Sequence, residues 1–176
     1  MARSHLPFAM CCWWLYARVM GYPITGYGSL IAALGGLLPD IDHPESVIGR
    51  RVRVLSLPIS TVFGHRGITH SLLATGAMVG VLWWITHNPA YEPYRWMIAP
   101  LCIGYLSHLL GDSMTPSGVP LFYPKKKTYS FNLFKTRSTV EFVVVSVLTL
   151  ALLVGLEIGG EVYENSMVIL EENLRF

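Results

Sequence analysis

The chain has 176 residues, which is enough for one domain of ordinary size and too few for two domains with separate cores. Apolar residues make up 52% of the sequence and charged residues only 14%, whereas soluble domains carry about 25% charged residues. The mean hydropathy of +0.46 and the net charge of +2 exclude a disordered chain and a highly charged nucleic-acid binder. Soluble monomers rarely expose so much apolar surface, so the composition indicates a membrane protein. We expect one membrane-embedded domain over residues 1–176, with membrane lipids and no nucleic acid as partners.

Five apolar segments follow one another along the chain, and each is predicted to form a helix: residues 6–20, 26–38, 72–86, 96–110 and 140–158. Only the last approaches the roughly 20 residues that a helix needs to span a bilayer, since the other four have 13 to 15 residues. The short segments either cross a locally thinned bilayer or form buried helices of a compact bundle. Residues 6–38 form either a spanning hairpin or a re-entrant segment. The predicted fold class is all-α, a polytopic membrane bundle of about four to five helices.

The basic residues are distributed unevenly between the two faces of this bundle. If all five segments cross in alternation, one face holds the N-terminal residues and the loops 39–71 and 111–139. That face carries ten of the thirteen basic residues, namely Arg3, Arg50, Arg51, Arg53, Arg66, Lys125, Lys126, Lys127, Lys135 and Arg137. The positive-inside rule makes it the cytoplasmic face and leaves the polar tail 159–176 outside. We expect the first segment to be retained, because Arg18 and Pro23 interrupt the position where a signal peptide would be cleaved.

The sharpest polar motif on the predicted cytoplasmic face is the pair His108 and Asp112 at the end of an apolar helix. Residues at i and i+4 of a helix share a face, so this imidazole and this carboxylate point the same way. Unpaired polar groups at that place are costly, and they are usually functional. The alternative is a capping aspartate beside a histidine that is hydrogen-bonded to the backbone.

Two further motifs lie in the loop 39–71. His65 and His70 are five residues apart, which would turn their rings about 140° from each other on a continuous helix. We therefore expect His65 in a loop and His70 in the first turn of the next helix; the alternative is two surface histidines in a flexible loop. Asp40 and Asp42 follow the end of an apolar helix, where two carboxylates suit a divalent cation. The alternative for them is an ordinary helix stop with aspartate turns.

A mixed set of imidazoles and carboxylates fits a divalent metal, with zinc favoured over manganese or iron. The set is larger than one tetrahedral ion can use. Either two ions bind, or some of these groups orient the ligands or act as the general base. Asp42 or Asp112 would then accept a proton from a metal-bound water, and Arg66 would hold an anionic group of the substrate.

The motifs at residues 37–44 (LLPDIDHP), 63–71 (FGHRGITHS) and 104–120 (GYLSHLLGDSMTPSGVP) together resemble the YdjM family of bacterial inner-membrane proteins. The resemblance covers residues 3–125 and includes the family's early histidine, here within RSHL at residues 3–6. It implies an all-helical bundle in the bacterial inner membrane, distantly related to zinc-dependent phospholipase C and P1-type nucleases, which cleave phosphodiesters. It also implies metal ligands at His5, Asp40, Asp42, His65, His70, His108 and Asp112.

Two functions remain open at this point. The first is a membrane-bound hydrolase with one or two metal ions, which acts on a phosphoester or lipid-like substrate at the cytoplasmic interface. The second is a non-catalytic inner-membrane protein whose His/Asp cluster binds metal structurally or organises a partner interface. A transporter is disfavoured, because the middles of the predicted helices hold no ionisable residue that would form a pathway. The sequence predicts no oligomeric state.

Overall fold

The computed structural model describes residues 2–64, 66–135, 138–147, 149–150 and 154. Its α-helices include α1 (Ala2–Met20), α2 (Gly26–Gly35), α3 (Arg53–Phe63), α4 (Leu72–Ile85) and α5 (Ile98–Ser113). Three short 3₁₀ helices connect them: η1 (Pro39–Asp42), η2 (Ile68–His70) and η3 (Glu92–Met97). Within these residues the extended structure is limited to an isolated β-bridge between Val119 and Tyr129. The predicted all-α class is confirmed.

Four of the five predicted apolar segments form helices with nearly the predicted bounds, as α1, α2, α4 and α5. The fifth, 140–158, is helical over residues 139–147. Its remaining residues, apart from 149–150 and 154, lie outside the described part of the chain, as does the polar tail 159–176. The prediction of a continuous loop over 39–71 was wrong, because α3 forms inside it. This helix carries Pro58 in its interior, and a short apolar run with a central proline is more typical of a loop.

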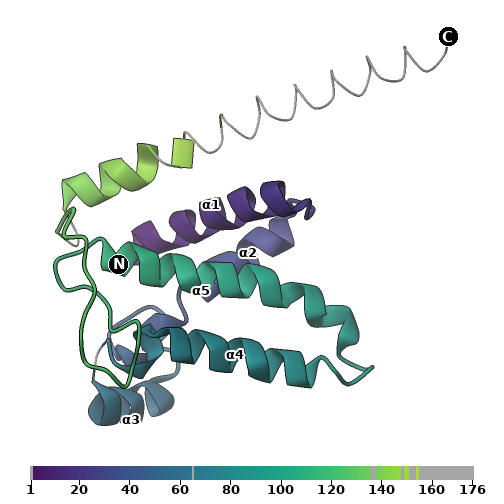
Figure 1. The fold of residues 1–176 in the computed structure, drawn as a ribbon, viewed down its shortest axis with the longest axis horizontal. Helices are drawn as coiled ribbons and strands as arrows, with labels where there is room; N and C mark the ends of the chain where they lie inside the picture. The colour runs from purple at the N-terminus through teal and green to yellow at the C-terminus, as the bar shows by residue number, and fades with distance from the viewer. Residues whose placement is uncertain (1, 65, 136–137, 148, 151–153, 155–176) are drawn as a thin grey trace.

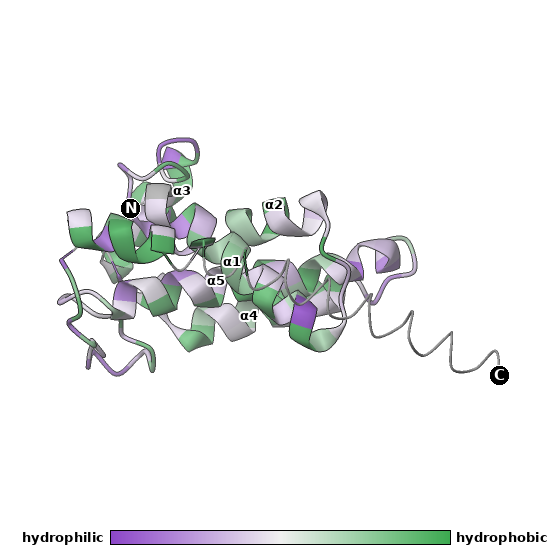
Figure 2. Ribbon diagram, turned by 90° about the horizontal axis from the view of Figure 1, so that it is seen from above, coloured by the Kyte–Doolittle hydropathy of each residue, from purple (hydrophilic) through white to green (hydrophobic). Residues whose placement is uncertain are grey.

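Polar and apolar side chains are distributed in an unusual way in this bundle. Trp84 is 78% exposed and Val54 87% exposed, whereas His70 and His108 are completely buried. Figure 2 shows strongly hydrophilic residues mainly at the two ends of the helices and in the loops. Within the described residues, none of the helices has both the length and the apolar character that crossing a membrane requires. Buried polar groups beside exposed apolar surface are the informative departure from an ordinary globular domain.

The helices α1, α2 and α5 pack against one another, and α4 packs against α5 (Figure 1). Glycine allows α2 and α5 to approach closely. A Cβ atom on Gly104 would lie 1.9 Å from the carbonyl oxygen of Ala32, and one on Gly35 would lie 2.3 Å from that of Leu101. Small residues permit such backbone contact between helices. The contact places the C-terminal end of α2 against Leu101 and Gly104 of α5, about one turn before His108.

We expect Gly104→Ala to lower the free energy of unfolding by about 1–3 kcal/mol, because the added methyl group must push α2 away from α5. Thermal unfolding of the purified protein in detergent measures this effect. Gly76→Ala is the matched control, since a Cβ atom on Gly76 of α4 would meet no atom within 4 Å. Equal midpoints for the two variants would contradict the close approach of the helices.

Candidate metal centre

Five buried imidazole and carboxylate side chains meet at one end of the bundle. They come from four segments that are far apart in the sequence: His5 from α1, Asp40 from η1, His70 from η2, and His108 and Asp112 from α5. Each is at most 5% exposed. The packing of α1 and α2 on α5 therefore determines which of these side chains face one another.

His108 lies at the middle of this group, with its two ring nitrogens in different surroundings. Its Nδ1 atom is 2.7 Å from the carbonyl oxygen of Gly36, so Nδ1 carries the proton and donates it, and Nε2 has a lone pair. Nε2 lies 3.7 Å from Oδ2 of Asp112 and 3.8 Å from Oδ1 of Asp40. Among the described residues this buried nitrogen has no hydrogen-bond partner. A buried lone pair that faces two carboxylates is electrostatically unfavourable unless a cation lies between them.

His70 repeats this arrangement from the other side of the group. Its Nδ1 atom is 3.1 Å from Oδ2 of Asp42, and its Nε2 atom is 3.5 Å from Oδ2 of Asp112. The hydroxyl oxygen of Thr69 also lies 3.1 Å from Nδ1. Both histidines thus have an acceptor at Nδ1 and direct Nε2 toward Asp112.

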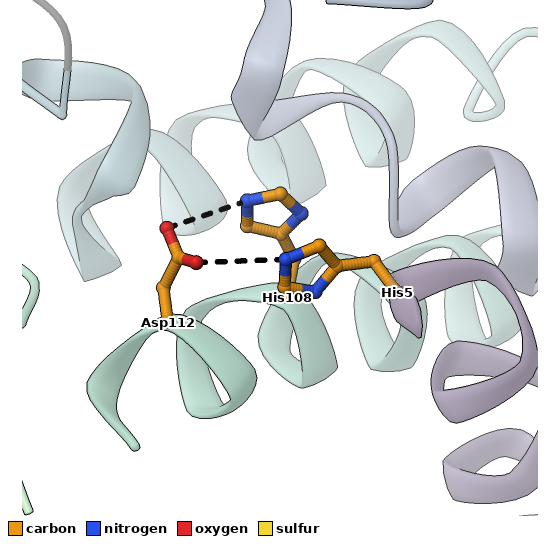
Figure 3. A group of neighbouring side chains, drawn as sticks. All are labelled: His5, His108 and Asp112. Atoms are coloured by element: carbon orange, nitrogen blue, oxygen red, sulfur yellow. Dashed lines mark ion pairs between the residues drawn. The ribbon is translucent and has the colours of Figure 1, made fainter. Parts of the chain in front are cut away.

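His5 completes the group from the first turns of α1. Its ring stacks on that of His108, with centroids 4.1 Å apart and planes inclined by 20° (Figure 3). Its Nε2 atom lies 3.5 Å from Oδ1 of Asp112. The two oxygens of Asp112 therefore face different histidines, with Oδ1 toward His5 and Oδ2 toward His70 and His108.

Arg66 supplies a positive charge beside Asp112. Its Nη2 atom lies 3.0 Å from Oδ2 of Asp112, and its Nη1 atom donates to the carbonyl of Gly118 at 3.2 Å. His5 faces the other oxygen of the same carboxylate, and His108 faces the oxygen that pairs with Arg66. The guanidinium is thus an ion-pair partner for Asp112, whose carboxylate can serve as an anionic ligand.

The donor atoms fit a divalent ion in two overlapping groups, in each of which they all lie within 4.8 Å of one another. The groups are His5, His108 and Asp112, and Asp40, His70 and His108. Tetrahedral zinc with bonds of about 2.1 Å places its ligand atoms about 3.4 Å apart. The pairs measured here, at 3.5 to 3.8 Å, need only a small contraction. Nε2 of His108 belongs to both groups and has one lone pair, so it ligates a single ion.

Six of the seven predicted metal ligands are close together in the structure, and the seventh, His65, lies outside the described residues. Asp42 differs from the others in what it contacts. Its Oδ2 atom accepts hydrogen bonds from the backbone N–H of Arg66 at 3.0 Å, from the hydroxyl of Thr69 and from Nδ1 of His70. Asp42 therefore contacts the Nδ1 side of the His70 ring, whereas Asp112 faces the Nε2 side.

Sequence reasoning missed Glu141, which is only 8% exposed. Its carboxylate accepts a hydrogen bond from the hydroxyl of Ser4, and both residues line a small cavity together with His5, Gly111 and Met114. The available signal was a carboxylate in the first turn of an apolar segment, where an ionisable residue is costly and usually functional. Val144 and Val145 also line this cavity, so it lies between His5 and the helical residues 139–147.

The amino-acid sequence of this chain is similar to those of known bacterial proteins. Over 133 residues it is 39% identical to the inner membrane protein YdjM of Escherichia coli. The matched region is 70% of this chain and 65% of that protein, so the chain spans just under two thirds of this relative's length. Over 120 residues it is 42% identical to the uncharacterized protein YvsG of Bacillus subtilis, covering 68% of this chain and 71% of that protein. No solved structure matches the chain. The family model for the YdjM inner membrane protein matches residues 1–170, and the chain therefore belongs to the YdjM family.

Proposed function

We propose that this protein is a membrane-bound, metal-dependent hydrolase that acts on a phosphoester or lipid-like substrate at the cytoplasmic face of the bacterial inner membrane. The observation that carries the proposal is the convergence of the buried Nε2 atoms of His70 and His108 on the carboxylates of Asp40 and Asp112. The relative in Escherichia coli that is named an inner membrane protein supports the location.

The donor set suits one or two ions of zinc, with manganese or iron(II) as alternatives. When bound, such an ion lowers the pKa of a coordinated water toward 7 and stabilises the charge that develops on the ester. The ligands would be His5, Asp40, His70, His108 and Asp112, with His65 as a further predicted ligand. A second ion would have to be held without His108, because Nε2 of His108 has one lone pair.

Asp112 and Arg66 are the residues to which we assign the chemistry. Asp112 presents its two oxygens to different histidines, so one oxygen is able to hold the metal while the other accepts a proton from water. Arg66 has its guanidinium beside this carboxylate, where the N–H groups not used by Asp112 and Gly118 would bind an anionic oxygen of a phosphate. Asp42 was the other predicted base, and its contacts favour a different role that is argued below.

Membrane embedding is supported by the apolar side chains that α2 and α4 expose. Tyr27 and Leu30 of α2 are 76% and 61% exposed, and Trp83 and Trp84 of α4 are 54% and 78% exposed. Patches of this kind mark contact with lipid or with protein partners. We propose a multi-pass arrangement in which α1, α4 and α5, with lengths of about 21 to 29 Å, cross a locally thinned bilayer, while α2 and residues 36–38 return the chain to the face of His5 and Asp40. The metal centre would then lie at head-group depth on the face rich in basic residues.

The test combines metal analysis with hydrolysis assays on protein purified in detergent without chelators. We expect one or two equivalents of metal per chain, together with hydrolysis of a phosphodiester or phospholipid that chelation removes and zinc restores. Absence of metal from the wild-type protein would overturn the proposal. Bound metal without hydrolysis of any phosphoester, and with a sharp loss of thermal stability on chelation, would favour the non-catalytic, structural site instead.

A further inference from the structure

Asp42 is a buried carboxylate, 1% exposed, whose Oδ2 atom contacts Nδ1 of His70 in the metal centre. We propose that Asp42 is a positioning residue: it holds the ring proton of His70 at Nδ1 and thereby directs the Nε2 lone pair toward Asp112. This inference rests on the proposed metal site. It assigns Asp42 a role other than metal ligand or general base.

The hydrogen bonds around Asp42 fix the direction of donation. An ionised carboxylate only accepts, so the Nδ1 atom of His70 at 3.1 Å must carry the proton. A neutral imidazole has one proton, and Nε2 therefore has the lone pair that faces Oδ2 of Asp112 at 3.5 Å. The hydroxyl of Thr69 donates to the same oxygen of Asp42 and leaves its own lone pairs toward Nδ1. All of these contacts favour one tautomer.

His70 and His108 differ in the group that accepts the proton of Nδ1, which is a carboxylate for His70 and a backbone carbonyl for His108. His108 reaches the same tautomer by donating from Nδ1 to the neutral carbonyl of Gly36. Histidines that bind metals almost always donate their other N–H to a carboxylate, a carbonyl or water, and a charged acceptor increases the basicity of the ligating nitrogen. Asp42 thus makes His70 the stronger donor of the two histidines.

Asp42 also fixes the loop that carries His70. Oδ2 accepts from the backbone N–H of Arg66, a residue in the left-handed conformation with φ +60°. The side chain of Arg66 meanwhile pairs with Asp112. Three donors therefore occupy the oxygen of Asp42 that faces His70, which suits a fixed anchor and not a group that must release and accept protons.

The experiment compares Asp42→Asn and Asp42→Ala with the wild-type protein in detergent. Zinc affinity is measured by competition with a chromophoric chelator, and the tautomer of His70 is read from the ¹⁵N shifts of its ring in metal-free protein. We expect zinc to bind about 10- to 100-fold more weakly to Asp42→Ala, and the ring proton to redistribute toward Nε2. Asp42→Asn keeps an acceptor oxygen without the charge, so we expect the Nδ1–H tautomer to persist with a smaller loss of affinity.

Glu45→Gln is the matched control, because Glu45 follows closely on the same loop but is 67% exposed and pairs with Arg53. It should leave both readouts unchanged. If wild type binds zinc while both Asp42 variants keep its affinity and tautomer, the positioning role is overturned and the metal site stands. If wild type binds no zinc but the tautomer shifts in Asp42→Ala, the proposed function fails and the orientation of His70 by Asp42 stands. If Asp42→Ala does not fold, the affinity of Asp42→Asn decides.

Discussion

The His108→Ala variant is expected to bind zinc at least about 100-fold more weakly than the wild-type protein and to lose hydrolytic activity with it. The Nε2 atom of His108 belongs to both groups of ligand atoms, so its removal leaves two protein donors in each group. Structural zinc sites derive about 10–16 kcal/mol from four ligands, so the loss of one ligand is worth about two to three orders of magnitude in affinity. Elemental analysis of the purified variant measures the bound metal directly.

His87→Ala is the matched control for this variant. His87 is exposed and follows α4, and its backbone N–H bonds to the carbonyl of Trp84 independently of the side chain. We expect it to retain the wild-type metal content. Because His108 is completely buried, its removal also leaves a cavity, so the folded state of both variants is checked by circular dichroism. A folded His108→Ala protein with undiminished metal content would refute the assignment of His108 as a ligand.

The parts of the site that depend on local geometry could be predicted from the sequence. His108 and Asp112 are four residues apart in an apolar run, and the helix places their side chains 3.7 Å apart, as the i, i+4 spacing requires. Ser71 accepts a hydrogen bond from the backbone N–H of Ala74, so it caps α4 as its position before an apolar run predicts. Both features involve residues within one turn of each other.

The different roles of Asp40 and Asp42 could not be predicted, because the sequence presents them as equivalent carboxylates. They belong to the 3₁₀ helix η1, where successive side chains turn by about 120°, so residues at i and i+2 point in different directions. Asp40 consequently faces His108, and Asp42 faces Nδ1 of His70. The helical form of this segment depends on how α2 packs against α5. The same packing brings the carbonyl of Gly36 to His108, and no local sequence pattern reveals it.

Asp112→Asn is expected to destabilise the metal-free protein by about 3–5 kcal/mol at neutral pH, because the guanidinium of Arg66 loses its buried anionic partner. His5, His70 and His108 remain around the amide of the variant, and none of them supplies the negative charge that the guanidinium loses.

Chemical unfolding in detergent at pH 7 measures this loss of stability, with Glu45→Gln as the control. Glu45 and Arg53 form an exposed pair at 3.8 Å, which is worth about 0–1 kcal/mol, so that variant should differ little from wild type. An unfolding free energy of Asp112→Asn equal to that of wild type would mean that the ion pair with Arg66 does not stabilise the fold. Zinc binding should fall in the same variant, since an amide oxygen is a weaker ligand than the carboxylate that faces all three histidines.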